Sequence, residues 1–215
     1  MVDRTGATAE PPAHAGKSEQ RDLWGPYSKH VLSFLDLAGK QLKIVIDASN
    51  GMAGTMIPKI FGKKGENVEG LEIVELNFDN TKGEFVHEPN PLVASNVRQL
   101  QEAVVEQGAD VGFCYDGDAD RCVAVDEKGN IVGCDHLTAV MAPFFLAEAP
   151  GAAVVYDLRS SKAVEEEIEK AGGEPIKGRV GHVFMKQELA DSEGIFGGEL
   201  SGHFYFRENF NADSG

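Results

Sequence analysis

Three aspartates at alternate positions carry the clearest chemical signal in this 215-residue chain: Asp116, Asp118 and Asp120. Carboxylates this close together repel one another unless a cation intervenes, and without one some of their pKa values would rise. Oxygen ligands at this density suit Mg²⁺ or Ca²⁺, whereas zinc prefers cysteine and histidine. Arg121 follows directly and can face an anion. The segment therefore predicts a Mg²⁺ site beside a phosphate or a similar anion.

Two other chemistries fit parts of this segment. An EF-hand loop needs glycine at its sixth position and helices on both sides, but Arg121 stands there and the flanks are strand-like. We reject that interpretation. A haloacid-dehalogenase-type phosphatase would use Asp116 as its nucleophile, although Asp120 stands where that class has threonine or valine. The phosphatase stays open as an alternative enzyme, and a solvated acidic turn is the interpretation without a ligand.

A glycine-rich loop from Gly197 to His203 supplies a second group of polar side chains. Its glycines allow a ligand to approach the backbone closely. Glu199 and Ser201 can bind neighbouring sugar hydroxyls, and His203 can transfer a proton near neutral pH. An ordinary polar turn is the alternative, and the aspartate cluster elsewhere in the chain makes a binding loop the better interpretation.

Other strand-end loops give weaker signals. Arg179 and His182 precede a helix that carries Lys186, and a helix N-terminus with basic neighbours attracts phosphate. Arg159 follows a buried strand. The segment Asp47 to Gly54 lacks the G-K-[ST] ending of a phosphate loop, so a structural strand-to-helix turn is the better interpretation.

The composition limits the classes of partner. A net charge of −15 argues against nucleic acid or an anionic membrane, which require a basic face. No apolar run is long enough to span a bilayer, and residues 1–20 lack the apolar stretch of a secretory signal. Cys114, Cys122 and Cys134 form no C-x-x-C pair, which predicts reduced, buried thiols. We expect a cytoplasmic protein that binds neither nucleic acid nor membranes.

Hydrophobic periodicity predicts that these loops lie at strand ends in two successive α/β units. In the first unit we expect strands over 42–46, 71–77, 109–115, 122–125 and 131–132, with helices over 22–38, 53–61 and 92–106. In the second unit we expect strands over 152–156, 174–180, 195–196 and 204–206, with helices over 137–147, 162–171 and 184–189. The predicted fold class is α/β, with two three-layer α/β/α units and mixed sheets.

The chain divides into three predicted parts. Residues 1–21, rich in alanine, proline, glycine and charge, form a flexible lead. Residues 22–131 form the first unit with the metal loop, and residues 132–215 form the second unit with the sugar-binding loop. No helix is predicted after the strand at 204–206, so we expect the second unit to be incomplete at its C-terminal end.

Taken together, these motifs resemble the α-D-phosphohexomutase family, which contains phosphomannomutases and phosphoglucomutases. Asp116 to Arg121 is similar to the family's metal-binding loop, and Glu199 to His203 is similar to its sugar-specificity loop. Asp47 to Gly54 resembles the opening of its second domain, and Arg179 to Lys186 resembles a segment of its third. The motifs occur in the family's order over residues 22–215.

The resemblance implies a Mg²⁺-dependent isomerase that interconverts hexose 1-phosphate and hexose 6-phosphate. A phosphoserine on the first domain phosphorylates the sugar, and the bisphosphate reorients and returns its other phosphate to the serine. The resemblance implies that the three aspartates hold Mg²⁺, that Arg121 steadies the phosphoryl group, and that His203 assists proton transfer.

The resemblance also implies a set of substrate contacts for mannose or glucose phosphates. Glu199, Ser201 and His203 would contact the sugar, and Arg159 and His182 would lie on the same cleft.

This chain departs from the family pattern in two places. The T-x-S-H-N-P serine loop and the fourth domain are absent, so we expect a central portion that cannot turn over a sugar phosphate alone. Leu200 stands where glucosamine mutases usually have glutamine, which favours mannose or glucose without separating them. A non-catalytic sugar-phosphate-binding protein stays open as a further alternative.

Overall fold

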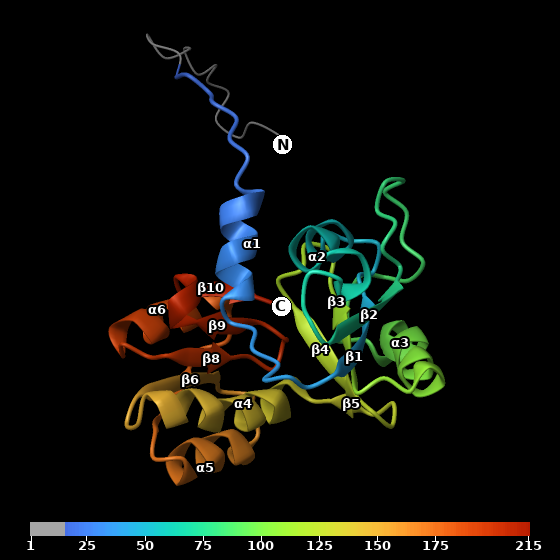
Figure 1. Cartoon of the computed structure of the whole chain (residues 1–215). Coiled ribbons are helices and arrows are strands. Elements are labelled where there is room, and N and C mark those ends of the chain that lie inside the picture. Colours follow the sequence, from blue (N-terminus) through green and yellow to red (C-terminus); the bar gives the residue numbers. More distant parts are fainter. Residues whose placement is uncertain (1–15) are drawn as a thin grey trace, which may run out of the picture.

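The structure is a computed structural model that describes residues 16–215, in which two α/β units lie side by side (Figure 1). The first unit contains α1 (Trp24–Leu32), β1 (Leu42–Asp47), α2 (Ala53–Phe61), β2 (Leu71–Leu76), α3 (Ala94–Gln107), β3 (Val111–Tyr115), β4 (Cys122–Asp126) and β5 (Ile131–Val132). The second unit contains α4 (Cys134–Glu148), β6 (Ala153–Asp157), α5 (Lys162–Lys170), β7 (Glu174–Gly178), α6 (His182–Asp191), β8 (Phe196–Gly198), β9 (Phe204–Phe206) and β10 (Ala212–Ser214). Two short 3₁₀ turns complete the set, η1 (Lys63–Gly65) and η2 (Arg207–Asn209).

The two sheets share one topology. The strand order is β2-β1-β3-β4-β5 in the first sheet and β7-β6-β8-β9-β10 in the second. In each sheet the first three strands of this order pair in parallel, and the remaining pairings are antiparallel. Both sheets are therefore mixed, and the predicted α/β class with two successive units is confirmed.

Alternating side chains of the central strands build the three layers. Along β1, Val45 packs with α3 on one face, while Ile44 and Ile46 pack with α2 on the other. Along β6, Val154 and Tyr156 face α4 and α5, and the intervening residue faces α6. Successive side chains of a strand point to opposite faces, so central strands covered on both faces read as continuous apolar runs.

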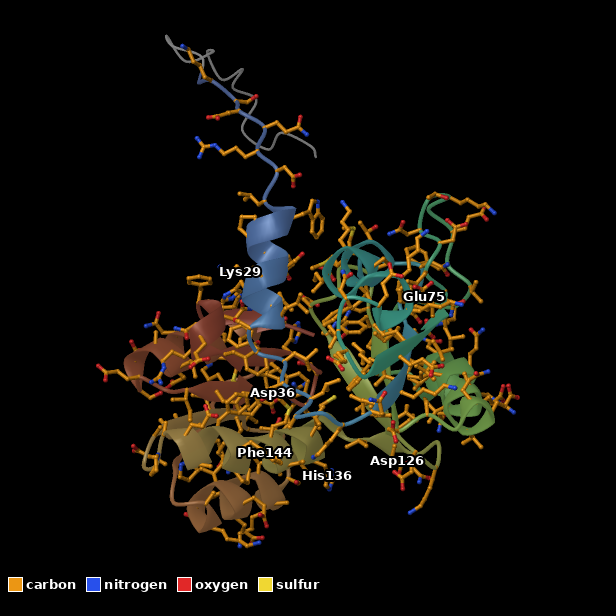
Figure 2. The ribbon with its side chains drawn as sticks, in the orientation of Figure 1. Lys29, Asp36, Glu75, Asp126, His136 and Phe144 are labelled. Atoms are coloured by element: carbon orange, nitrogen blue, oxygen red, sulfur yellow. The ribbon has the colours of Figure 1, made fainter. Side chains whose placement is uncertain are left out.

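The structure corrects several expected boundaries. Helix α1 ends at Leu32 instead of continuing to residue 38. The chain then turns at Asp36, labelled in Figure 2, whose carboxylate accepts the Ala38 N–H at 2.7 Å, and Ala38 has a φ of +50°, which no right-handed helix allows. The predicted domain boundary after residue 131 would cut β5, which pairs entirely with the first sheet. That boundary therefore moves past Val132.

Strand β10 was not predicted. Its polar sequence, Ala-Asp-Ser, has no apolar alternation, and it forms because its backbone pairs with β9 at the sheet edge. With β10 the second sheet has five strands, as the first does.

The predicted lead over residues 1–21 lies largely outside the described residues, and residues 16–21 contain no helix or strand. Within the described part of the chain, no helix is both long enough and apolar enough to cross a membrane. The three cysteines are unpaired and buried, as predicted, and burial raises the pKa of Cys114 to about 12.

Candidate metal and substrate site

Two loops at equivalent places in the two units contact each other. Residues 116–121, the aspartate loop, join β3 to β4, and residues 199–203, the Glu-Ser-His loop, join β8 to β9. Each loop lies at the carboxyl end of a parallel strand, where open α/β sheets bind ligands. The Cys122 N–H donates to the Gly202 carbonyl at 3.0 Å, so the two loops are joined through their backbones.

Asp116 holds the aspartate loop in shape through hydrogen bonds from the loop's backbone and from Arg121. Its side chain is 1% exposed, and its Oδ1 accepts the backbone N–H groups of Asp120 at 3.1 Å and Arg121 at 3.3 Å. The Arg121 Nε donates to the Asp116 Oδ2 at 2.6 Å and lies 3.7 Å from the Asp120 Oδ1. The loop is thus shaped by one buried carboxylate and balanced by one guanidinium.

The three predicted metal ligands come together. One carboxylate oxygen from each of Asp116, Asp118 and Asp120 lies within 4.8 Å of the others, and Asp118 is exposed. Burial, a hydrogen bond with Asp116 and the charges of its two neighbours raise the pKa of Asp120. The negative charges of grouped carboxylates repel one another, and a bound cation relieves that repulsion. Because Mg²⁺ prefers oxygen ligands, these three carboxylates are a suitable donor set for it.

The β1–α2 loop supports the aspartate loop, a role that the sequence analysis did not assign. The Met52 N–H donates to the Gly117 carbonyl at 2.9 Å, and a Cβ on Gly51 would lie 2.6 Å from that oxygen. The buried Asp47 shapes this support, because its carboxylate accepts the Ser49 N–H at 2.9 Å and lies 3.0 Å from the His87 Nε2. Asp47 to Gly54 is therefore a structural strand-to-helix turn, as its sequence indicated.

Glu199 is the buried centre of the second loop. Its side chain is 1% exposed, and its carboxylate accepts the Gly181 N–H at 2.7 Å and the Tyr205 hydroxyl at 2.8 Å. Burial by itself would raise the pKa of Glu199, but hydrogen bonds from His203, Gly181 and Tyr205 outweigh it and lower the pKa to about 2. Glu199 is therefore a charged group whose partners are already supplied by its own chain.

His203, the last residue of the Glu-Ser-His loop, contacts the aspartate loop. Its Nε2 is 3.4 Å from the Asp120 Oδ2, and its Nδ1 is 2.9 Å from the Ser201 Oγ and 3.4 Å from the Glu199 Oε2. Burial lowers the pKa of His203, but the contacts with Glu199 and Asp120 and the charge of Asp213 reverse that effect and raise it. The imidazole thus joins the predicted metal loop to the predicted sugar loop.

Asp213 and Lys186 complete this centre. The Lys186 Nζ lies 2.6 Å from the Asp213 Oδ1, and the Asp213 carboxylate belongs to one close group with Asp120 and His203. The sequence analysis did not identify Asp213, because its position depends on β10, whose polar sequence does not indicate a strand. Tyr205 lies in a predicted strand, but its contact with Glu199 was not identified, because an aromatic residue in a strand reads as core.

The two remaining predicted residues lie beside this centre. Arg159 forms a 2.8 Å ion pair with the buried Asp157, and the Leu200 N–H donates to that same carboxylate at 2.7 Å. Arg159 is therefore tied to the Glu-Ser-His loop. His182 is the first residue of α6, directly after Gly181, and its side chain makes no hydrogen bond with the residues that the structure describes.

Comparison with known proteins identifies the family to which this fold and site belong. Residues 25–129 match the model of the phosphoglucomutase/phosphomannomutase alpha/beta/alpha domain II, and residues 134–215 match that of alpha/beta/alpha domain III. The chain belongs to the phosphoglucomutase/phosphomannomutase family. The family resemblance inferred from the motifs is thereby confirmed.

Individual relatives show the same relationship. The chain is 34% identical over 205 residues to a phosphomannomutase of Salmonella montevideo, covering 94% of this chain and 45% of that protein. It is 36% identical over 213 residues to a protein of Xanthomonas campestris pv. campestris (strain B100) named phosphohexose mutases, covering 98% and 46%. A phosphoglucomutase/phosphomannomutase family protein from Burkholderia thailandensis superimposes with a TM-score of 0.84 at 30% identity, over 92% of this chain and 42% of that one. The chain thus spans less than half the length of these relatives.

Proposed function

We propose that this chain is the central portion of a Mg²⁺-dependent phosphohexomutase that interconverts the 1- and 6-phosphates of mannose or glucose. The observation that carries the proposal is the 3.4 Å approach of the His203 Nε2 to the Asp120 Oδ2. That contact brings the aspartate loop, whose oxygens suit the metal ion of a phosphoryl transfer, next to the Glu-Ser-His loop, which carries a hydroxyl and an imidazole. Family membership supports the same reaction class.

The aspartate loop supplies the charge for phosphoryl transfer. Asp116, Asp118 and Asp120 would hold Mg²⁺, which when bound neutralises negative charge on the transferred phosphoryl group. Arg121 would leave Asp116 and turn its guanidinium toward a phosphoryl oxygen, because a metal at the loop replaces it as counter-ion.

The Glu-Ser-His loop handles the sugar hydroxyl. As the phosphoryl group moves from a serine oxygen outside this chain to a hydroxyl of the hexose phosphate, that hydroxyl would give its proton to neutral His203, and the released serine oxygen would take a proton from a group outside this chain. On return of the other phosphate, the serine hydroxyl would give that proton back, and His203 would give its proton to the sugar oxygen that is released. Ser201 and Arg159 would bind the substrate, and His182 would contribute through the start of α6.

Glu199 acts differently from the simple sugar clamp suggested by its motif. Because four groups of the chain already surround its carboxylate, a sugar hydroxyl reaches it only by replacing one of them. We therefore propose that Glu199 mainly fixes the orientation of Ser201 and His203. A cytoplasmic location follows in the proposal from the buried, unpaired cysteines.

The proposal is tested by calorimetric titration of mannose 1-phosphate and glucose 1-phosphate into the chain with saturating Mg²⁺. We expect millimolar, Mg²⁺-dependent binding that is lost in Ser201→Ala and kept in Lys162→Gln, a control on the exposed surface of α5. We expect no isomerisation by the chain alone, measured by ³¹P NMR. The absence of any heat at millimolar sugar phosphate would contradict the proposal, and robust turnover would contradict the need for an external serine.

The sequence disfavours an Asp116 phosphatase, because Asp120 stands where that class has threonine or valine. The burial of Asp116 and its contact with Arg121 do not separate the two roles, because Arg121 would have to move before Asp116 acted either as a nucleophile or as a Mg²⁺ ligand. Phosphatase activity that vanishes in Asp116→Asn, together with beryllium fluoride binding, would restore this alternative. Saturable sugar-phosphate binding in a protein that has no serine partner would favour the binding-protein alternative.

A further inference from the structure

We propose that Asp120, His203 and Asp213 form a second cation site, selective for a transition-metal ion such as Zn²⁺, which adjoins the Mg²⁺ site. One ligand atom from each of the three residues lies within 4.8 Å of the others. The residues come from three separate segments: the aspartate loop, the Glu-Ser-His loop and the edge strand β10. The C-terminal end of the chain lies between the two units, which brings Asp213 to this place (Figure 1).

The donor set differs in kind from that of the aspartate loop. Imidazole nitrogen with two carboxylates and an open position suits Zn²⁺, whereas Mg²⁺ takes oxygen ligands and retains water. Asp120 directs its two oxygens to different partners, the Oδ1 to Arg121 at 3.7 Å and the Oδ2 to His203 at 3.4 Å, and it belongs to both close groups of possible ligands. One carboxylate can therefore serve two neighbouring cations.

The imidazole is already oriented for a metal. Metal-binding histidines commonly direct their second ring nitrogen to a carboxylate, which fixes the ring and its tautomer. The Nδ1 of His203 faces the buried Glu199 at 3.4 Å and Ser201 at 2.9 Å, which leaves the Nε2 directed toward Asp120. Glu199 lies outside the three-residue set, so this support is independent of the clustering itself.

Lys186 competes with a divalent cation for the Asp213 carboxylate. Its ammonium lies 2.6 Å from the Asp213 Oδ1 and is the cation that contacts this carboxylate in the described structure. A divalent ion must displace it, so zinc affinity is set partly by this lysine. Bound zinc would also occupy the Nε2 of His203 and block proton transfer there. That inhibitory consequence rests on the proposed function, whereas the binding itself does not.

The test is a calorimetric titration of Zn²⁺ into the 215-residue chain in excess Mg²⁺, with Co²⁺ absorption as a second probe of the ligand set. We expect Asp213→Asn to weaken Zn²⁺ binding at least tenfold and to leave Mg²⁺ binding unchanged. Asp118→Asn is the matched control, expected to weaken Mg²⁺ binding and to spare Zn²⁺. Asp120→Asn should weaken both.

Lys186→Met keeps the proposal testable if an aspartate variant fails to fold. Removal of the competing ammonium should tighten Zn²⁺ binding severalfold. The proposal is overturned if Zn²⁺ affinity is the same in the wild type, Asp213→Asn and Lys186→Met, or if Asp118→Asn removes the binding of both metals. If the chain binds Zn²⁺ as expected but does not bind sugar phosphates, only the proposed function is contradicted.

Discussion

The β3–β4 and β8–β9 loops occupy the same place in two sheets of one topology, yet they balance charge in opposite ways. The aspartate loop gathers three carboxylates beside one guanidinium, and burial together with the neighbouring aspartates raises the pKa of Asp120. The Glu-Ser-His loop surrounds one buried carboxylate with donors, which lower the pKa of Glu199. In our proposal a cation from outside neutralises the first loop, whereas the carboxylate of the second has its partners within the chain.

This difference shows how a duplicated scaffold can divide its work. A loop whose charges repel can gain free energy when a metal binds, so it is suited to capture one. A loop whose charge is already paired holds its side chains in place before a substrate arrives. The contact between His203 and Asp120 joins the two loops, so the oriented side chains of the second unit lie beside the carboxylates of the first.

The largest expected effect is the opposite stability response of the two loops to neutralised carboxylates. Glu199→Gln should lower the free energy of unfolding by about 3 kcal/mol, because it breaks a buried, charge-assisted network. Asp118→Asn should change it by less than about 0.5 kcal/mol or raise it. Urea unfolding measures both, with Glu166→Gln on the surface of α5 as a control. Equal losses in the two loops would remove the distinction.

The pH dependence of stability should separate the loops in the same way. The pKa of Glu199 is lowered in the folded chain from 4.5 to about 2, so its contribution is fully present above 4.5 and is lost as pH falls toward 2. Wild type should therefore lose about 3 kcal/mol relative to Glu199→Gln across that window. Unfolding curves at several acidic pH values measure this, and parallel pH profiles would contradict it.

A smaller effect is expected where the loops touch. Gly202 has φ +89°, and a Cβ there would lie 3.0 Å from the Cys122 carbonyl oxygen. That oxygen can move away only if β4 moves, because Cys122 is the first residue of β4. Gly202→Ala should destabilise the chain by about 2 kcal/mol. Gly172→Ala is the control, because it also has positive φ but no neighbour within 4 Å. A similar loss in both variants would assign the effect to backbone strain alone.

The smallest expected effect concerns one donor to Glu199. Tyr205→Phe removes the 2.8 Å hydrogen bond but keeps the ring, so it should cost about 1 kcal/mol in unfolding free energy. The pKa of Glu199 should rise at the same time, which NMR titration of its side-chain carboxyl would detect. An unchanged pKa would show that Gly181 and His203 suffice.

Local patterns predicted most of the fold. The buried run of β1, the alternation of β2 and the glycine after α3 each mark an element by residues close in sequence, and the aspartate spacing marks a metal loop in the same way. The positions of β10 and Asp213 depend on pairing with β9, and the buried carboxylate of Glu199 receives its hydrogen bonds from Gly181 in another loop and from Tyr205 in β9. Such contacts between distant segments leave no local periodicity, so the sequence predicted the residue types at the site but not their partners.

The most direct test of the account is a calorimetric titration of Mg²⁺ into the wild-type chain, Asp118→Asn and Asp126→Asn. Asp126 lies at the β4–β5 turn, at the other end of β4 from the aspartate loop (Figure 2). We predict one Mg²⁺ per chain in the wild type and in Asp126→Asn, with affinity at least tenfold weaker in Asp118→Asn. Equal affinity in all three proteins would show that the aspartate loop is not the metal site and would contradict the account.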